Sequence, residues 1–304
     1  MKICLKNVSI ISVNNAVEVK RAGDVVFENN KIFYEKNNLE NCDKVVSDEN
    51  LVILPKFNYF NVESRTNKIN NMQYDFFNLE NVTLKSLEKQ LDNFKKNNIL
   101  PFMFLKDILL PESVYDIIVP FCHKNKIKIM VCVGETLTEL GTFDKLYNMS
   151  PIDFLESYGV LDCEPIIFSA ANLEKDDLEK LSYYGATICL NLTHDLLCGN
   201  GIASILTMQK LGLNIVFNTN VDDVFKEMFL CYTLPKGLLN SKTAISLRDV
   251  FCMATTNFNK IVKNNNANEI NLSNCIVLKT DNKFDDELKN VVLTGNNNQI
   301  VNIF

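Results

Sequence analysis

Residues 166–220 read IIFSAANLEKDDLEKLSYYGATICLNLTHDLLCGNGIASILTMQKLGLNIVFNTN, and short apolar runs alternate in this stretch with amphipathic segments. The apolar runs are predicted to be buried strands, and the segments whose apolar side chains recur every three or four residues are predicted to be helices. Strands are predicted at residues 165–169, 186–191 and 214–218, and helices at residues 175–184 and 202–211. Successive parallel strands need a helical crossover, so this alternation predicts right-handed βαβ units around a parallel sheet.

The same alternation extends to both sides of this stretch. Helices are predicted at residues 84–96, 111–124, 151–158, 222–233 and 247–263, and strands at residues 99–105 and 126–133. The two ends of the chain instead hold short β-rich pieces, the later ones at residues 275–279, 290–293 and 299–303. We therefore predict an α/β protein with a TIM-like (β/α) barrel over residues 55–264 and a small β-sandwich domain built from residues 1–54 and 265–304.

Composition narrows the function classes. The chain has 304 residues, of which 47% are hydrophobic and 22% charged, and its net charge is -6 with the basic residues dispersed, so no nucleic-acid partner is expected. No apolar run is long enough to span a membrane, and the N-terminal MKICLKNVSIISVNN is predicted to be a strand rather than a secretory signal. Ten cysteines without a C-x-x-C pair are predicted to be reduced thiols in a cytoplasmic protein.

Four segments resemble the metal-dependent amidohydrolases, especially the branch that deaminates methylthioadenosine and S-adenosylhomocysteine, guanine or cytosine. VILPKFNYFNVE (52–63) is similar to the strand-one segment P-G-F-x-N-x-H-x-H, and CVGET (132–136) is similar to H-x-A-E-T. The stretch quoted at the outset resembles the run from L-A-H-x-x-H-L to L-G-T-D. MATTN (253–257) is similar to a late M-A-T-x-N turn.

The resemblance implies a zinc or iron site in which a metal-bound water attacks and a glutamate moves protons. Only Glu135 matches the family, at the position of that glutamate. The positions of the metal ligands fall on Asn61, Glu63, Cys132, Ser169 and Asn220, and Asn172 stands where a further histidine is expected. The whole chain has two histidines, His123 and His194, so a four-histidine site cannot form. No metal cofactor is therefore expected, because amide and hydroxyl oxygens are weak ligands for zinc.

Several interpretations of the candidate residues stay open. Glu135 is either an acid/base group or a retained structural residue, and Cys132 is either a nucleophile or a buried inert thiol. A substitute metal site from Glu63, Cys132 and His194 is a further alternative. The candidates for lining a polar pocket at the strand ends are Asn172, Asn191 and His194, in company with Asn61 and Asn220, and these amides either bind a ligand or satisfy one another.

The chain also resembles a shortened member of the family. Only residues 64–131 separate the strand-one segment from the H-x-A-E position, so at least one βα unit is expected to be missing and the barrel to be incomplete or closed by fewer strands. The leading hypothesis is a catalytically degenerate amidohydrolase, a pseudoenzyme that binds a small molecule or a protein partner. The alternatives are a deaminase-like hydrolase of C–N bonds in a purine, pyrimidine or nucleoside, with an altered metal site, and a subunit of a homo- or hetero-oligomer whose partner supplies the chemistry.

Overall fold

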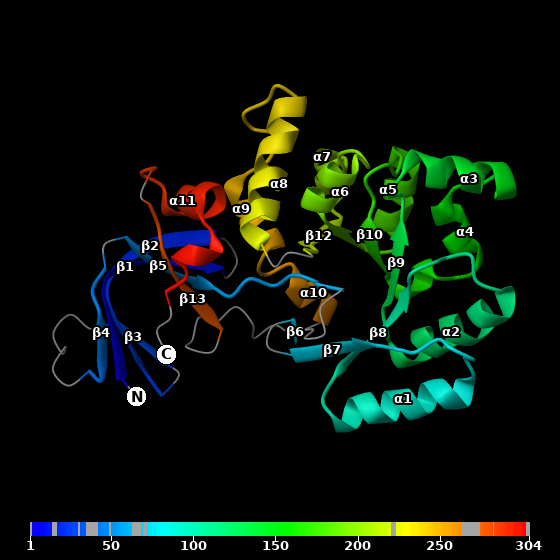
Figure 1. Ribbon diagram of the computed structural model, residues 1–304, viewed down its shortest axis with the longest axis horizontal. Coiled ribbons are helices and arrows are strands. Elements are labelled where there is room, and N and C mark those ends of the chain that lie inside the picture. Colours follow the sequence, from blue (N-terminus) through cyan, green and yellow to red (C-terminus); the bar gives the residue numbers. More distant parts are fainter. Residues whose placement is uncertain are drawn as a thin grey trace. The chain divides into compact units, whose positions relative to one another are not determined.

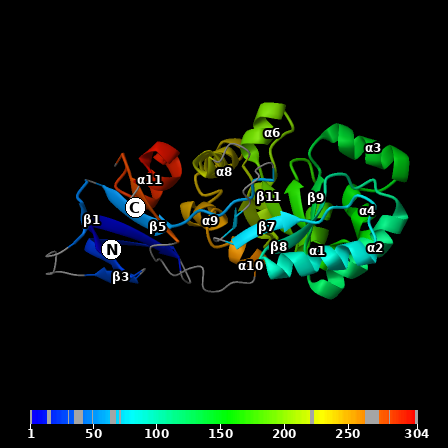
Figure 2. The ribbon, with the colours of Figure 1, turned by 60° about the horizontal axis from the view of Figure 1, so that its bottom comes forward.

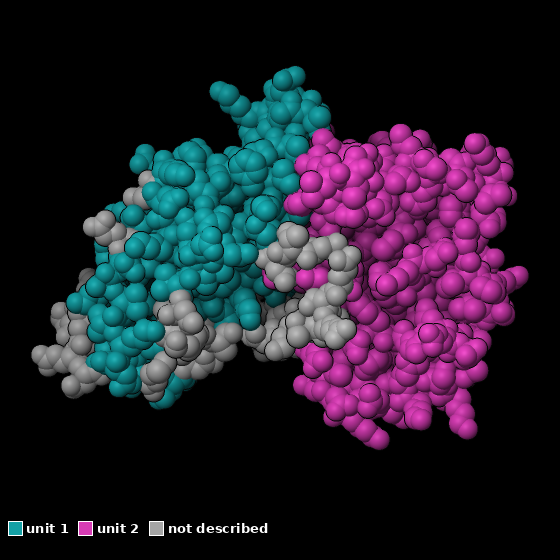
Figure 3. Space-filling model, viewed as in Figure 1, with its two compact units in different colours: residues 1–58, 223–304 teal, residues 59–222 magenta. Residues whose placement is uncertain are grey.

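The computed structural model describes residues 2–13, 17–29, 31–34, 42–48, 50–62, 68–69, 72–219, 223–262, 274–281 and 283–301. The chain divides into two compact units, residues 1–58 with 223–304 and residues 59–222, which Figure 3 colours separately. The sequence predicted domain boundaries after residues 54 and 264, whereas the two units meet after residues 58 and 222, so the second boundary differs most. The late helices, at residues 223–262, group with the two ends of the chain and not with the parallel strands.

The first unit contains one bent six-stranded sheet, where a β-sandwich was expected. Its strands are β1 (Lys2–Val13), β2 (Val17–Glu28), β3 (Lys31–Tyr34), β4 (Lys44–Val46), β5 (Leu51–Pro55) and β13 (Cys275–Lys279), in the order β13-β5-β1-β2-β3 with β4 also paired to β1. The register of β1 shifts between Leu5 and Val8, and Asn7 there has φ 53°. This bulge bends β1, so that β4 pairs with its first half and β5 with its second half, and both pairings remain in one sheet.

Four helices complete the first unit: α8 (Val224–Leu238), α9 (Leu247–Met253), α10 (Phe258–Val262) and α11 (Glu287–Thr294). The strand predicted at residues 290–293 is wrong, because these residues belong to α11. Asp286 caps this helix and accepts hydrogen bonds from the backbone N–H groups of Leu288 and Lys289, at 2.9 and 3.2 Å. Residues 299–301 hold a short 3₁₀ turn (Asn297–Gln299) and a single bridge to β13 in place of the predicted last strand.

The second unit alternates strands and helices as predicted. Its strands are β6 (Lys68–Ile69), β7 (Met72–Phe76), β8 (Leu100–Leu105), β9 (Ile129–Val133), β10 (Ile166–Ser169), β11 (Thr187–Leu190) and β12 (Asn214–Phe217). Its helices are α1 (Leu84–Lys96), α2 (Glu112–Asn125), α3 (Leu137–Tyr147), α4 (Pro151–Ser157), α5 (Lys175–Tyr183), α6 (Leu192–Cys198) and α7 (Ile205–Lys210), with a 3₁₀ turn at Leu161–Cys163. The strands follow one another in the sheet from β6 to β12, and the pairs from β7 to β12 are parallel. Helices line the outside of the sheet (Figures 1 and 2).

This parallel sheet curls into a half-barrel around Phe60. The ring of Phe60 is fully buried, and its centroid lies 5.6 Å from that of Tyr74 in β7, 5.9 Å from Phe102 in β8 and 5.6 Å from Phe168 in β10. Its backbone forms a parallel bridge with Asn218, directly after β12. One ring can touch three strands only on the concave side of a curved sheet, so Phe60 fills part of the interior of the half-barrel.

The curled sheet is consistent with an incomplete barrel. Two βα units, β7-α1 and β8-α2, lie between the strand-one segment and β9. Together with the bridge at Phe60 this gives seven strand positions from β7 to the bridge, where a TIM barrel has eight strands. Between the bridge and β7, the described link is made by the Tyr74 hydroxyl, which lies 3.2 Å from the Asn61 backbone nitrogen and 3.3 Å from its carbonyl oxygen.

None of the helices in the described part of the chain combines the length and the apolar character that a bilayer crossing requires.

Candidate functional site

The candidate site lies at the carboxyl ends of β9, β10 and β11, inside the second unit. Glu135 follows β9 through Gly134, whose φ of +71° is a conformation that side-chain-bearing residues rarely adopt. Thr136 then caps α3 and accepts a hydrogen bond from the Glu139 backbone nitrogen at 3.1 Å. The Glu139 carboxylate reaches back to the backbone N–H groups of Gly134 (3.1 Å) and Glu135 (3.0 Å). These bonds fix the backbone that presents the Glu135 side chain.

The Glu135 carboxylate has two side-chain partners. Its Oε1 lies 3.1 Å from His194 Nε2 and accepts a hydrogen bond from Asn200 Nδ2 at 3.0 Å. The His194 and Glu135 side chains are 40% and 36% exposed, so the pair is open to solvent. Asn172 holds the two loops together, because its Nδ2 donates to the backbone carbonyls of Glu135 and Asn200, both at 2.7 Å. Four residues from three strand ends therefore form one hydrogen-bonded cluster.

A second carboxylate, Asp195, lies beneath this cluster. It is fully buried in the first turn of α6, and its Oδ1 accepts a hydrogen bond from Asn200 at 3.4 Å. Its Oδ2 is buried without a hydrogen-bond partner among the described residues. Burial raises the pKa of Asp195 from 3.8 to about 6; the Asn200 hydrogen bond and His194 oppose this rise, and Glu135 adds to it. Asp195 therefore takes up a proton close to neutral pH.

A cavity of about 410 Å³ opens beside Glu135. It lies between the loop after β8 and the start of α3, and its wall mixes charged, hydroxyl and apolar side chains. Its lining residues are Lys106, Asp107, Ile108, Leu109, Cys132, Glu135, Thr136, Thr138, Glu139, Thr142 and Phe143. Pockets at the strand ends of α/β folds are common ligand sites, so this cavity is the natural place for a small molecule.

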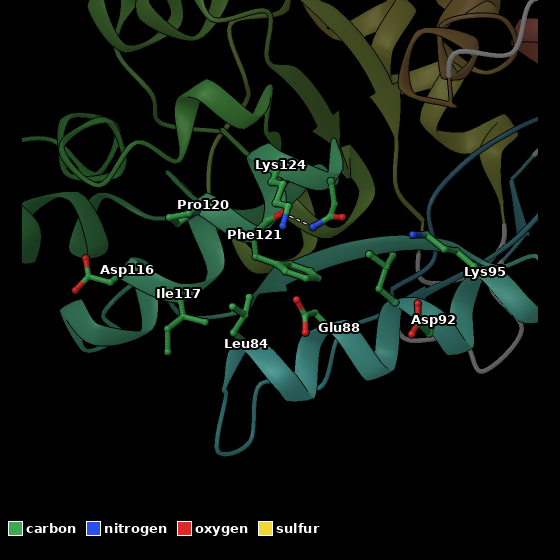
Figure 4. A pocket seen from close by; sticks show the side chains of 11 residues that line it. Leu84, Glu88, Asp92, Lys95, Asp116, Ile117, Pro120, Phe121 and Lys124 are labelled. Atoms are coloured by element: carbon green, nitrogen blue, oxygen red, sulfur yellow. Dashed lines mark hydrogen bonds between the residues drawn. The ribbon is translucent and has the colours of Figure 1, made fainter.

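Another cavity, of about 530 Å³, lies between α1 and α2 (Figure 4). Its floor includes the buried Leu91 and Phe121, and charges of both signs frame it. The charged lining residues are Glu88, Asp92, Lys95, Asp116 and Lys124. It belongs to the helical layer, whereas Glu135 follows the end of a strand.

The structure separates the predicted site residues into three groups. Glu135, Asn172 and His194 come together in the hydrogen-bonded cluster, and Cys132 lines the same cavity as Glu135. Asn191 serves the cluster indirectly, because it caps α6 and its Oδ1 accepts from the His194 backbone nitrogen at 3.2 Å. Ser169 and Asn61 are described but are not part of the cluster's hydrogen bonds, and Ser169 ends β10 in a left-handed conformation with φ 74°. Glu63 and Asn220 lie outside the described residues.

The described residues at the expected ligand positions, Asn61, Cys132 and Ser169, carry an amide, a thiol and a hydroxyl group, which are weak ligands for zinc or iron unless they lose a proton. Burial raises the pKa of the Cys132 thiol from 9.0 to about 11, with Glu135 and Glu139 adding to the rise, so this sulfur keeps its proton at neutral pH. A metal-binding cysteine must instead be a thiolate. Across the described part of the chain, no group of three His, Cys, Asp or Glu side chains is arranged to hold a metal.

Three residues in or next to the cluster were not predicted from the sequence: Asn200, the buried Asp195, and Cys198, whose sulfur lies 3.7 Å from His194 Nε2. Asn200 belongs to the GNG segment (199–201), which reads as an ordinary loop before a helix. Asp195 and Cys198 stand one and four residues after His194, and this helical spacing was the available signal.

Several solved structures have a similar fold. Guanine deaminase from C. acetobutylicum, solved with bound guanine, has a TM-score of 0.74, with 12% identity over 99% of this chain and 98% of that one. An adenosine deaminase from Xanthomonas campestris, solved with bound zinc, has a TM-score of 0.70, with 9% identity over 98% of this chain and 90% of that one. A triazine hydrolase variant has a TM-score of 0.73, with 10% identity over 96% and 91% of the two chains. The chain thus shares its fold with these three solved proteins.

The curated proteins most similar in sequence include two deaminases. A 5'-deoxyadenosine deaminase of Methanothermobacter thermautotrophicus is 26% identical over 140 residues, which is 44% of this chain and 33% of the relative. The 5-methylthioadenosine/S-adenosylhomocysteine deaminase of Acetivibrio thermocellus is 31% identical over 135 residues, 42% and 31% of the two chains. The chain thus matches about a third of the length of these relatives. No family model matches the chain. The resemblance to the deaminase branch of the amidohydrolases is confirmed.

Proposed function

We propose that this chain is a deaminase-fold protein that binds a small polar molecule beside Glu135 and does so without the metal of its relatives. In this proposal it is a pseudoenzyme with respect to metal-dependent deamination, which has been lost with the ligand set. The observation that carries the proposal is the bonding of Glu135, whose Oε1 is shared between His194 and Asn200. A proton-shuttling glutamate needs an activated water, and the donors around this one do not fit the ion that would activate it.

The cavity chemistry suits a ligand with hydrogen-bond donors. Glu135 is an acceptor in the cavity wall, and the threonines Thr136, Thr138 and Thr142 add hydroxyl groups that donate or accept. Ile108, Leu109 and Phe143 supply apolar surface on the same wall. A flat amino-substituted ring or a small amine would use both kinds of contact.

Metal analysis tests the first half of the proposal. The purified chain is incubated with zinc, manganese or iron, desalted and measured by mass spectrometry of the elements, with the zinc-containing Xanthomonas campestris adenosine deaminase as positive control. We expect far less than one metal per chain. Near-stoichiometric metal that survives desalting would contradict the proposal.

Ligand binding tests the second half. Thermal unfolding of the chain is followed with a panel of amines, purines and pyrimidines, for the native protein, for Glu135→Gln and for Glu112→Gln, which alters an exposed residue on α2. We expect a compound that raises the melting temperature of the native protein and of Glu112→Gln and has little effect on Glu135→Gln. A compound that stabilises all three proteins equally binds elsewhere and contradicts the assignment of the site.

A second candidate function is a deaminase-like hydrolase with an altered site. The curated relatives are deaminases, and the contact of Glu135 with His194 favours this candidate because a glutamate and a histidine together can move protons. Ammonia release from 5'-deoxyadenosine, methylthioadenosine, guanine and cytosine tests it. If this candidate is right, ammonia release is measurable and Glu135→Gln abolishes it. If no compound releases ammonia, the hydrolase candidate is rejected and the binding function is retained.

The proposal also concerns the fold, the cellular location and the partners of the chain. We regard the chain as a TIM-like barrel shortened by one βα unit, with a small domain built from both termini, acting in the cytoplasm without metal, nucleic-acid or membrane partners. The proposal includes assembly into a homo- or hetero-oligomer, in which a second chain completes the ligand site. Light scattering of the purified protein, alone and after addition of cell lysate fractions, measures it.

A further inference from the structure

Cys198 and His194 lie on one face of α6. They are four residues apart, which places side chains one helical turn apart and next to each other. The Cys198 sulfur lies 3.8 Å from His194 Nδ1 and 3.7 Å from Nε2. Cys198 is the exposed cysteine among those that the structure describes, whereas the others are buried or half-buried. An exposed thiol beside an imidazole is the arrangement from which cysteine nucleophiles are made.

Glu135 determines which imidazole nitrogen is free to accept a proton. An ionised carboxylate only accepts hydrogen bonds, so the 3.1 Å contact places the proton of a neutral His194 on Nε2. The lone pair is then on Nδ1, the nitrogen 3.8 Å from the sulfur. Asn200 holds the same carboxylate oxygen at 3.0 Å and so keeps Glu135 facing the imidazole. The sulfur is nearly equidistant from the two ring nitrogens, so proton transfer to Nδ1 requires a small change of the Cys198 side-chain torsion.

We propose that Cys198 is a nucleophile, that His194 Nδ1 is the base that takes its proton, and that Glu135 is the positioning residue for that base. This inference goes beyond the binding function proposed above and does not rest on it. It assigns a metal-free chemistry to a scaffold whose relatives are named as deaminases. Cys198, His194 and Glu135 thus take the roles of nucleophile, base and orienting carboxylate, and none of these roles needs a metal ion.

The substrate class is an electrophilic acyl carbon with an apolar part. Leu196 and Leu197 precede Cys198 on α6 and are 40% and 81% exposed, so this end of the helix offers apolar surface to a ligand. In the same helical turn, Asp195 Oδ2 is fully buried without a hydrogen-bond partner among the described residues. An unused buried polar atom of this kind is costly, and an ordered water would satisfy it.

The reaction balances without any further reagent than water. The thiol proton moves to His194 Nδ1 as the sulfur forms a bond to the acyl carbon. The bond from that carbon to the leaving group breaks, and the leaving group takes the proton from Nδ1. Water, deprotonated by the same nitrogen, then attacks the thioester, which releases the carboxylic acid and returns the proton to the sulfur.

Alkylation by iodoacetamide tests the activated thiol. The rate at Cys198 is measured from its peptide by mass spectrometry between about pH 6 and pH 9, with glutathione as an ordinary thiol in the same tube. We expect Cys198 to react about tenfold faster than glutathione near pH 6.5, and His194→Gln and Glu135→Gln to lose that advantage. His123→Gln, which changes the other histidine, on α2, is the matched control and should keep it. A rate at Cys198 no higher than that of glutathione, or one that His194→Gln leaves unchanged, overturns the proposal.

An acyl probe tests the substrate class. p-Nitrophenyl acetate is mixed with the full-length protein, and released p-nitrophenolate is followed together with the mass of the Cys198 peptide. We expect a burst of about one equivalent and one acetyl group on Cys198, both lost in Cys198→Ser. If His194→Gln does not fold, the native protein and Cys198→Ser still decide the outcome. Acetylation at other residues only, or none at all, overturns the acyl assignment, and the metal content of the protein stays a separate measurement.

Discussion

Replacing Asp195 with asparagine should remove a loss of stability that sets in as the pH rises. The carboxyl group of Asp195 is 0% exposed, and burial raises its pKa from 3.8 to about 6. Asn200 is its one side-chain hydrogen-bond donor among the described residues, at 3.4 Å. Asparagine has nearly the shape of the protonated carboxyl group and does not ionise, so Asp195→Asn mimics the form that the folded protein prefers.

The magnitude follows from the two pKa values. The carboxyl group titrates at 3.8 in the unfolded chain and at about 6 in the folded one, so the folded state binds the proton more tightly and stability falls as the pH rises between these values. One pKa unit is worth about 1.4 kcal/mol. Ionised Asp195 therefore costs about 3 kcal/mol above pH 6 and about 1 kcal/mol near pH 4.5.

Urea unfolding followed by circular dichroism at about pH 4.5, 6 and 8 measures this cost. The free energy of unfolding of Asp195→Asn minus that of the native protein should grow by about 2 kcal/mol from the lowest to the highest pH. Asp144→Asn, at an exposed position on α3, is the matched control and should give a difference that does not change with pH. A difference for Asp195→Asn that stays constant, or shrinks as the pH rises, would refute the burial argument.

Further changes test the packing behind the site, each by the free energy of unfolding in urea. Phe60→Ala should cost about 4 kcal/mol because a fully buried ring is removed, whereas Phe229→Ala, at a ring that is 44% exposed, should cost under about 1 kcal/mol; equal costs would contradict the half-barrel core. Gly134→Ala should cost about 3 kcal/mol, since its Cβ would meet a leucine carbon at 2.5 Å, and Gly185→Ala, with similar φ and open space, about 1 kcal/mol. Tyr74→Phe should cost about 1–2 kcal/mol through its lost hydroxyl contacts, and an unchanged stability would show that they contribute nothing.

The parallel half of the fold was predictable because each element carries its own signal. The helix at residues 84–96 has apolar side chains at helical spacing, and the structure buries them as Leu87, Leu91 and Phe94. The C-terminal helix α11 was missed, since its Val291-Val292 pair is typical of a strand. Its buried residues nevertheless include Leu288, Val291 and Val292, which fits helical spacing, and the Asp286 cap decides between the two.

The candidate site was predictable as a set of residues and not as a geometry. Glu135 and His194 were both singled out, but their contact depends on where α6 begins, and Asn191 fixes that start by capping the helix. Asn200 carries no signal of its own in a loop of glycines and asparagine. The bent sheet of the first unit was missed for a similar reason, because a one-residue register shift in β1 leaves no mark on the alternation of apolar residues.

The Glu135 carboxylate lines a cavity, where it needs a cation or hydrogen-bond donors beside it. His194 and Asn200 supply the donors, and both come from the β11–α6 region of the same compact unit. The hydrogen-bonded cluster lies within residues 59–222, and under the proposed function ligand binding beside Glu135 should respond to changes at Glu135 and His194 rather than to added metal.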